Sequence, residues 1–285
     1  MPAATDATPL RTAVLTLLAL AAFAGNSLLA RAALRDTQID AASFTAIRIA
    51  SGAAVLWLIV RWRGGDARAG SWRSALALFA YAAAFSFAYL SLTAATGALL
   101  LFGAVQVTMI GVGLARGERL RPLQWTGFAL AFGGLVGLLL PGLTAPPLAG
   151  ALLMIAAGIA WGAYSLRGRS SAADATATTA GNFLRAAPMA LLLALATLPW
   201  ARIDAPGTAY ALASGALTSG LGYAVWYTAL KGLRATTAAT VQLSVPVLTA
   251  LAGVLLLAEP LATRLLLASA AVLGGIALVI AARRA

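Results

Sequence analysis

The feature that most constrains the fold of this chain is a series of long apolar runs that carry almost no charge. Ten of them approach or exceed the length of about 20 residues that a helix needs to cross the hydrocarbon layer of a membrane. They cover residues 12–30, 43–60, 74–91, 96–115, 122–140, 149–166, 178–199, 208–230, 236–257 and 263–282. A transmembrane barrel would instead show short segments of alternating polarity. The runs therefore predict an all-α polytopic membrane protein with ten transmembrane helices.

Composition supports this class and limits the available chemistry. The chain is 61% hydrophobic and 10% charged, so a soluble globule could not bury its apolar side chains. It contains no cysteine and no histidine, which excludes thiol and imidazole metal sites and disulfides. No Asp or Glu lies in the middle of an apolar run, and the P-loop pattern for ATP is absent. We therefore expect no metal, no cofactor and no catalytic residue.

The basic residues are distributed unevenly between the two sets of loops. Fourteen cations fall at the ends of the chain or in alternate loops, and these are Arg11, Arg61, Arg63, Arg68, Arg73, Arg116, Arg119, Arg121, Arg167, Arg169, Lys231, Arg234, Arg283 and Arg284. By the positive-inside rule, both termini are predicted to be cytoplasmic. Membrane topology thus explains the net charge of +12, and nucleic-acid binding is not expected. The excess of arginine over lysine indicates a GC-rich bacterial genome and hence the bacterial inner membrane.

The first run includes "LLALAAFAGNS", which resembles a signal-peptide core with its cleavage site. Apolar sequence continues to Ala33, however, and this favours an uncleaved first span.

The two halves of the chain share a repeated pattern. Glu118, Leu120 and the pair Gly133-Gly134 recur 141 residues later as Glu259, Leu261 and Gly274-Gly275. Earlier matches are Gly25 with Gly162 and Arg48 with Arg185 at an offset of 137, and Tyr89 with Tyr227 at an offset of 138. These matches predict two units, residues 1–148 and 149–285. Each unit holds five spans, an odd number, so the second would be inverted relative to the first. Inverted repeats around a central cavity are typical of alternating-access transporters.

Several short motifs occur together along the chain, and these are Thr45 to Arg48, Gly117-Glu118, Gly133-Gly134, Trp161-Gly162, Ala235 to Thr240, Pro246 and Glu259. With these motifs the chain resembles the drug/metabolite transporter superfamily, in particular its ten-helix drug/metabolite exporter branch. Among members of that branch, the chain resembles the exporters of aromatic amino acids. It departs from the pattern at Ala24-Gly25, where Trp-Gly is expected, and at Val105, where the second half has Pro246. The resemblance implies export of small metabolites.

Two arginines are candidates for substrate binding. Arg48 and Arg185 lie within spans at equivalent repeat positions, where an arginine is costly unless it faces water or a partner. A guanidinium group there could bind a substrate carboxylate. The alternative is a structural role, in which the side chain reaches the membrane interface or holds a helix end.

Aromatic and amide side chains within the spans form the second candidate group. Tyr81, Phe85 and Tyr89 are spaced by four and share one helix face. The further aromatic candidates are Trp161, Tyr164, Tyr223, Trp226 and Tyr227, and the amide candidates are Gln106, Asn182 and Gln242. The rings would suit an aromatic substrate, and the amides could bind its polar groups. The alternatives are an interfacial aromatic belt and hydrogen bonds between helices.

Prolines and acidic residues at span ends complete the predictions. Pro188 and Pro246 fall inside predicted spans 7 and 9, where each removes a backbone hydrogen bond, so we expect hinges there. Glu118 and Glu259 precede spans 5 and 10 and are expected to cap helix starts rather than carry protons. The paired glycines are expected to allow close helix packing.

Together these patterns predict an inner-membrane exporter of small metabolites, with amino acids including aromatic ones as the leading substrates, which works by alternating access without ATP. We expect it to work as a monomer, with a small-molecule substrate and membrane lipid as its partners. A membrane enzyme and a non-transporting receptor or assembly subunit are the alternatives. An enzyme should carry paired acids or histidine, and a receptor gives no reason for mirrored halves.

Overall fold

The computed structural model describes residues 9–67, 69–117, 120–142, 145–169, 174–230, 232–233, 238 and 241–282. Over these residues the secondary structure is helical, with no strand. The helices of the first half are α1 (Pro9–Asp36), α2 (Ala41–Trp62), α3 (Trp72–Tyr89), α4 (Ala94–Ala115) and α5 (Pro122–Leu139). Those of the second half are α6 (Leu148–Arg169), α7 (Ala175–Ala196), η1 (Leu198–Trp200), α8 (Ala205–Ala213), η2 (Ser214–Leu221), α9 (Gly222–Leu230), α11 (Ser244–Leu257) and α12 (Thr263–Ala281).

The helices follow the apolar runs of the sequence closely. Seven helices in the described ranges are by themselves long and apolar enough to cross a membrane, namely α1, α2, α4, α5, α6, α7 and α12. The predicted span 208–230 is one continuous rod made of α8, the π-helical segment η2 and α9. In the predicted span 236–257, α11 begins only at Ser244, and residues 236, 237, 239 and 240 lie outside the described part.

Polar residues at the loops set where several helices begin. Asp40, Ser71 and Thr93 are the N-caps of α2, α3 and α4, and each side chain accepts hydrogen bonds from backbone N–H groups of the first turn. Pro122 starts α5, at a position where its missing N–H costs nothing. Glu118, predicted to cap this helix, lies outside the described residues.

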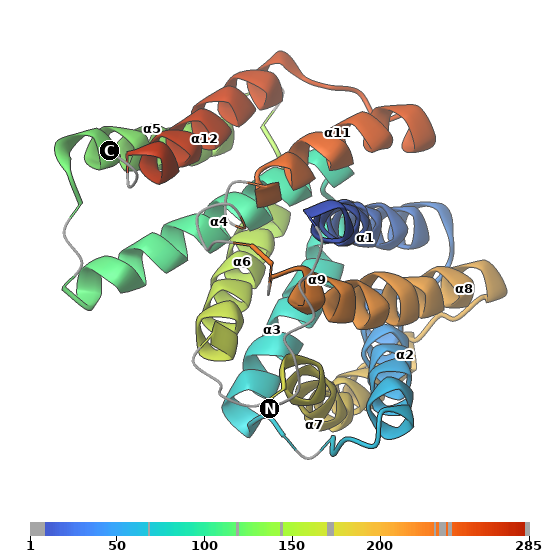
Figure 1. Ribbon diagram of the computed structural model, residues 1–285. Coiled ribbons are helices and arrows are strands. Elements are labelled where there is room, and N and C mark those ends of the chain that lie inside the picture. Colours follow the sequence, from blue (N-terminus) through green and yellow to red (C-terminus); the bar gives the residue numbers. More distant parts are fainter. Residues whose placement is uncertain are drawn as a thin grey trace, which may run out of the picture.

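Helices from the two halves of the chain pack against each other along their lengths (Figure 1). The most extensive contact joins α5 to α12, and α2 lies along α7. Glycine allows the first of these contacts: a Cβ added at Gly275 would lie 2.4 Å from the carbonyl oxygen of Gly127, and one added at Gly127 would lie 2.6 Å from that of Gly275. Of the repeated glycine pairs, Gly134 and Gly275 meet the neighbouring helix, whereas Gly133 and Gly274 face open space.

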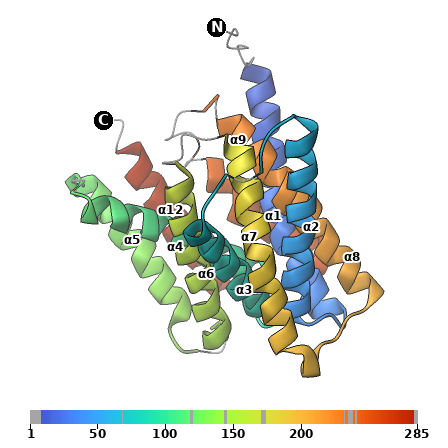
Figure 2. The ribbon, with the colours of Figure 1, turned by 90° about the horizontal axis from the view of Figure 1, so that it is seen from below.

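The remaining contacts enclose the centre of the bundle. Helix α3 packs on α6, α4 packs on α6 and α11, and α1 packs on η2, α9 and α11. Figure 2 shows the bundle from the side, with the beginning of α1 and the end of α12 at the same end. We call that end the basic end, because most cations of the sequence fall there, and the opposite end the Glu259 end.

The outward faces of the bundle are apolar. Leu130, Phe132, Leu192, Leu255 and Leu267 all expose about half or more of their surface. An apolar exterior of this kind is compatible with lipid and not with water. The helices and their exterior describe a multi-pass membrane protein.

Candidate functional site

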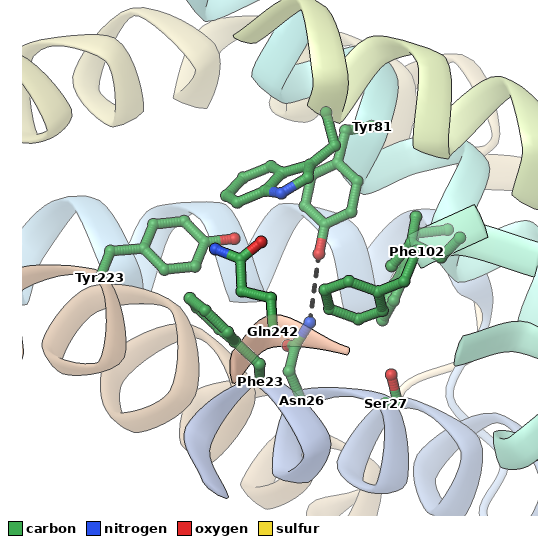
Figure 3. A pocket seen from close by; sticks show the side chains of 10 residues that line it. Phe23, Asn26, Ser27, Tyr81, Phe102, Tyr223 and Gln242 are labelled. Atoms are coloured by element: carbon green, nitrogen blue, oxygen red, sulfur yellow. Dashed lines mark hydrogen bonds between the residues drawn. The ribbon is translucent and has the colours of Figure 1, made fainter. Parts of the chain in front are cut away.

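A cavity lies at the centre of the bundle, between helices of both halves (Figure 3). The described residues that line it are Phe23, Asn26 and Ser27 of α1, Tyr81 and Phe85 of α3, Leu101 and Phe102 of α4, Trp161 of α6, Tyr223 of α9, and Gln242. Its volume is about 20 Å³. That is room for about one or two water molecules, so the cavity is too small for a metabolite in this conformation.

Aromatic rings form most of the cavity wall. The ring of Trp161 lies 4.8 Å from that of Tyr81 and 5.0 Å from that of Tyr223, measured between centroids. Phe23 makes edge contacts with Tyr223 at 6.0 Å and Trp226 at 5.6 Å. Such contacts hold the rings in place and leave an apolar, polarisable surface for a ligand.

Asn26 is the centre of a buried polar network on one wall. Its Oδ1 accepts hydrogen bonds from the hydroxyls of Ser214, at 2.8 Å, and Thr218, at 3.2 Å. Its Nδ2 donates to the hydroxyl of Tyr81 at 3.2 Å, the bond drawn in Figure 3. The amide is therefore oriented by partners on η2 and α3, and the network rigidifies this wall.

The segment η2, which is wound as a π-helix, supplies Ser214 and Thr218 to this network. Ser214, Thr218 and Ser219 all lie on it and are buried. Single-turn π segments within helices are frequent at functional sites, because they re-aim side chains. A Cβ added at Gly215 would lie 2.2 Å from the carbonyl oxygen of Arg48, so glycine lets η2 approach α2 directly.

Arg48 lies behind the aromatic wall rather than in it. It is 1% exposed, its Nη2 donates to the Tyr81 hydroxyl at 3.0 Å, and its Nε donates to Ser219 Oγ at 3.3 Å. The guanidinium carbon lies 5.3 Å from the centre of the Tyr81 ring and 4.7 Å from that of Phe85. Its Nη1 is buried and has no hydrogen-bond partner.

The structure divides the residues singled out in the sequence into three sets. Tyr81, Phe85, Trp161, Tyr223 and Gln242 line the cavity. Arg48, Tyr89, Tyr164 and Trp226 pack directly against lining residues. The third set lies outside the lining. It consists of Gln106, which is buried on α4, Tyr227, which is half-buried on α9, and Asn182 and Arg185 on α7.

Asn182 and Arg185 hold the loop between α2 and α3. The N–H of Ser71 donates to Asn182 Oδ1 at 2.9 Å, and Nη1 of Arg185 donates to the carbonyl oxygen of Ala69 at 2.9 Å. From α6, Nε of Arg167 donates to Ser74 Oγ at 3.0 Å. These contacts join the two halves at the basic end.

Contacts of a different kind join the two halves at the Glu259 end. Glu259 is 6% exposed; its Oε1 lies 2.8 Å from Nε of Arg31, and its Oε2 accepts the N–H of Ala94 at 2.7 Å. Because Ala94 is the first residue of α4, this carboxylate meets the positive end of a helix. Glu259 was expected to cap its own following helix; it caps α4 instead.

The predicted hinges also differ from one another. Pro188 lies inside α7 with its ring exposed at the outer surface. Pro246 lies in the first turn of α11, three residues after a helix break at Leu243. At this break, Ser244 Oγ donates to the carbonyl oxygen of Val241 at 2.6 Å. The break follows from proline chemistry, since Pro246 cannot donate to the carbonyl four residues earlier.

Sequence reasoning did not select Phe23, Asn26, Ser27, Leu101 and Phe102 as binding residues. Asn26-Ser27 in the middle of an apolar run was a usable signal, because polar side chains there need partners. The serine- and glycine-rich run "SGALTSGLG" marked η2 in the same way.

Comparison with known proteins is informative at the level of the family. Residues 148–281 match the model of the EamA-like transporter family. A relative from Pseudomonas aeruginosa, named only as an uncharacterized protein, is 62% identical over 275 residues, which cover 96% of each chain. The chain belongs to the EamA-like transporter family.

Membership of the EamA-like family indicates a membrane transporter of small molecules. A solved structure, described only as the crystal structure of a protein, aligns with a TM-score of 0.66 over 96% of this chain and 98% of that chain. At 21% identity it supports the fold alone. The family matches the resemblance to the drug/metabolite transporter superfamily that the motifs indicated.

Proposed function

We propose that this EamA-family chain exports small metabolites, first of all amino acids including aromatic ones, across the bacterial inner membrane by alternating access without ATP. The observation that carries the proposal is the central cavity. Its aromatic wall suits an apolar side chain, while Asn26, Gln242 and the tyrosine hydroxyls offer partners for polar groups. A cavity between two helical halves, which widens when the helices separate, is what a carrier needs to hold a solute in transit.

The packing of the helices supports two inverted five-helix repeats. In the proposed repeats, α1 to α5 correspond in order to α6, α7, the rod α8–η2–α9, α11 and α12. Three helices then pack on their own counterparts, in the pairs α2 with α7, α4 with α11, and α5 with α12. The contact of α3 with α6 likewise mirrors that of α1 with η2 and α9. The family match begins at residue 148, next to the predicted repeat boundary. This symmetry is the basis for opening to either side with similar energy.

The two ends of the bundle supply the gates. A 20 Å³ cavity cannot admit an amino acid, so helices must separate at one end. At the Glu259 end, separation breaks the contacts of Glu259 with Arg31 and Ala94. At the basic end, it releases the α2–α3 loop from Asn182 and Arg185. By the positive-inside rule the basic end faces the cytoplasm.

Counterflow in proteoliposomes tests the function. Vesicles loaded with unlabelled phenylalanine, methionine or a sugar phosphate should accumulate the labelled amino acids and not the sugar phosphate. Trp161→Ala should reduce accumulation at least ten-fold, because the indole forms the middle of the wall. The control is Trp72→Ala, an indole that is 60% exposed on the outer surface. Accumulation of no amino acid would redirect the proposal to another metabolite or drug class, and accumulation of nothing would favour a non-transporting subunit.

The topology has its own test, for which the chain is well suited because it contains no cysteine. Single cysteines at positions 119 and 264 should react with an impermeant thiol reagent from opposite faces of the membrane. Labelling of both from the same face would rule out the inverted repeats.

A further inference from the structure

The described residues that line the central cavity include no negatively charged side chain. None of its ten lining residues is acidic or basic. The ion pairs of Arg31 and Arg35 with Glu259, and of Arg35 with Asp36, lie at the Glu259 end and not in the lining of the cavity. A ligand in the cavity therefore meets the field of the nearest charge, which is that of Arg48.

Arg48 is a buried cation without a counter-ion. An arginine side chain in a protein is a cation. Within the described ranges no carboxylate lies within salt-bridge distance of it, and Nη1 lacks even a neutral partner. Burying an uncompensated charge is costly, and natural proteins retain such groups where a ligand or ion completes them. The ring faces of Tyr81 and Phe85 compensate only part of the charge.

Tyr81 links Arg48 to the cavity, because it lines the cavity and its hydroxyl is hydrogen-bonded to the guanidinium group. Its hydroxyl oxygen accepts hydrogen bonds from Nη2 of Arg48 and from Nδ2 of Asn26, which uses both lone pairs. Its own proton is then available to a third group, for which the neighbouring Tyr223 hydroxyl and a ligand at the cavity wall compete (Figure 3). A hydroxyl whose oxygen accepts a hydrogen bond from a guanidinium group is a stronger donor, and an anion is its best acceptor.

We propose that the cavity selects aromatic monocarboxylates: the carboxylate binds at the Tyr81 hydroxyl in the field of Arg48, and the ring packs among Phe23, Phe102 and Trp161. This inference rests on the proposed function and specifies the substrate class of the same site. The carboxylate neutralises Arg48. An ammonium group finds no acidic partner in the lining and is repelled by Arg48, so it contributes nothing to binding.

Three ligands with one carbon skeleton test the proposal: phenylalanine, 3-phenylpropanoate without the ammonium group, and phenethylamine without the carboxylate. Binding to the purified full chain in nanodiscs is measured by calorimetry at pH 7. We expect 3-phenylpropanoate to bind at least as tightly as phenylalanine and at least ten-fold more tightly than phenethylamine. Equal or tighter binding of phenethylamine, or no binding of either carboxylate, would overturn the proposal.

Variants separate the charge of Arg48 from a general loss of charge. Arg48→Gln should weaken 3-phenylpropanoate binding at least ten-fold and abolish the preference over phenethylamine, whereas Arg48→Lys should keep part of it. The matched control is Arg264→Gln, because Arg264 binds the carbonyl of Leu140 at the end of α5, remote from the cavity. If Arg48→Gln does not fold, Tyr81→Phe tests the same path, with the ligand series on the wild type as the primary evidence.

Counterflow with the same ligands distinguishes this proposal from the transport proposal. Binding in the expected order without counterflow would refute transport and leave the carboxylate site standing. Counterflow of amino acids without any preference for the carboxylate would refute the site and leave transport standing.

Discussion

The contacts of Glu259 allow a quantitative prediction about the gate at its end of the bundle. One carboxylate joins three elements: Arg31 on α1 at 2.8 Å, the first N–H of α4 at 2.7 Å, and its own loop between α11 and α12. In Glu259→Gln, the amide oxygen still accepts from Ala94, but the charged bond to Arg31 is lost. A hydrogen bond between charged groups contributes about 1.5–3 kcal/mol. The end that it closes should therefore open more readily by about 1.5–3 kcal/mol, which is roughly 10- to 150-fold in the equilibrium.

The assay is the reaction of a single cysteine in the cavity, Ser27→Cys, with an impermeant thiol reagent added from the side of the Glu259 end. The rate should rise in Glu259→Gln within the range above. The control is Asp36→Asn, which breaks an ion pair whose side chains are 32% and 45% exposed. An exposed pair contributes about 0–1 kcal/mol, so the rate should change at most about five-fold. An unchanged rate in Glu259→Gln, or an equal change in both variants, would refute the assignment of Glu259 as a gate contact.

Three further predictions concern stability and the cavity wall. Asp40→Ala should destabilise the detergent-solubilised protein by about 1–2 kcal/mol, measured as thermal unfolding, because α2 loses its N-cap. Burial alone would raise the pKa of Asp40, but hydrogen bonds to its carboxylate hold the pKa below the ordinary value of 3.8. Its contribution to stability is therefore complete above pH 3.8 and should be lost as the pH falls through the lowered pKa, a loss that Asp40→Ala must not show. Gly275→Ala should cost about 1–3 kcal/mol of unfolding free energy by forcing α5 and α12 apart, whereas Gly274→Ala, with nothing within 4 Å, should be neutral; equal effects would contradict the packing described. Asn26→Leu should reduce counterflow at least ten-fold by releasing the Tyr81 hydroxyl, and retained transport would show that the network is not needed.

The candidate site was only partly accessible from the sequence, and the two repeated arginines show why. Arg48 and Arg185 occupy equivalent positions in the repeat pattern, yet Arg48 binds Tyr81 from behind the cavity wall and Arg185 binds the α2–α3 loop. Their neighbours differ: Arg48 donates to Ser219 on η2, whereas Arg185 donates to the carbonyl oxygen of Ala69 in the α2–α3 loop. Sequence matching compares positions along the chain and does not include the neighbours that complete each site.

The amino-acid sequence by itself determined that the chain spans a membrane with apolar helices and approximately where each begins and ends. Insertion into lipid depends on the summed hydrophobicity of a run, which is a local property. Only the tertiary structure decided which face of each helix turns inward and hence that Phe23 and Phe102 join Tyr81 at the cavity. Lipid and protein interior are both apolar, so residues facing either one have similar composition, and the direction of a side chain follows from helix packing.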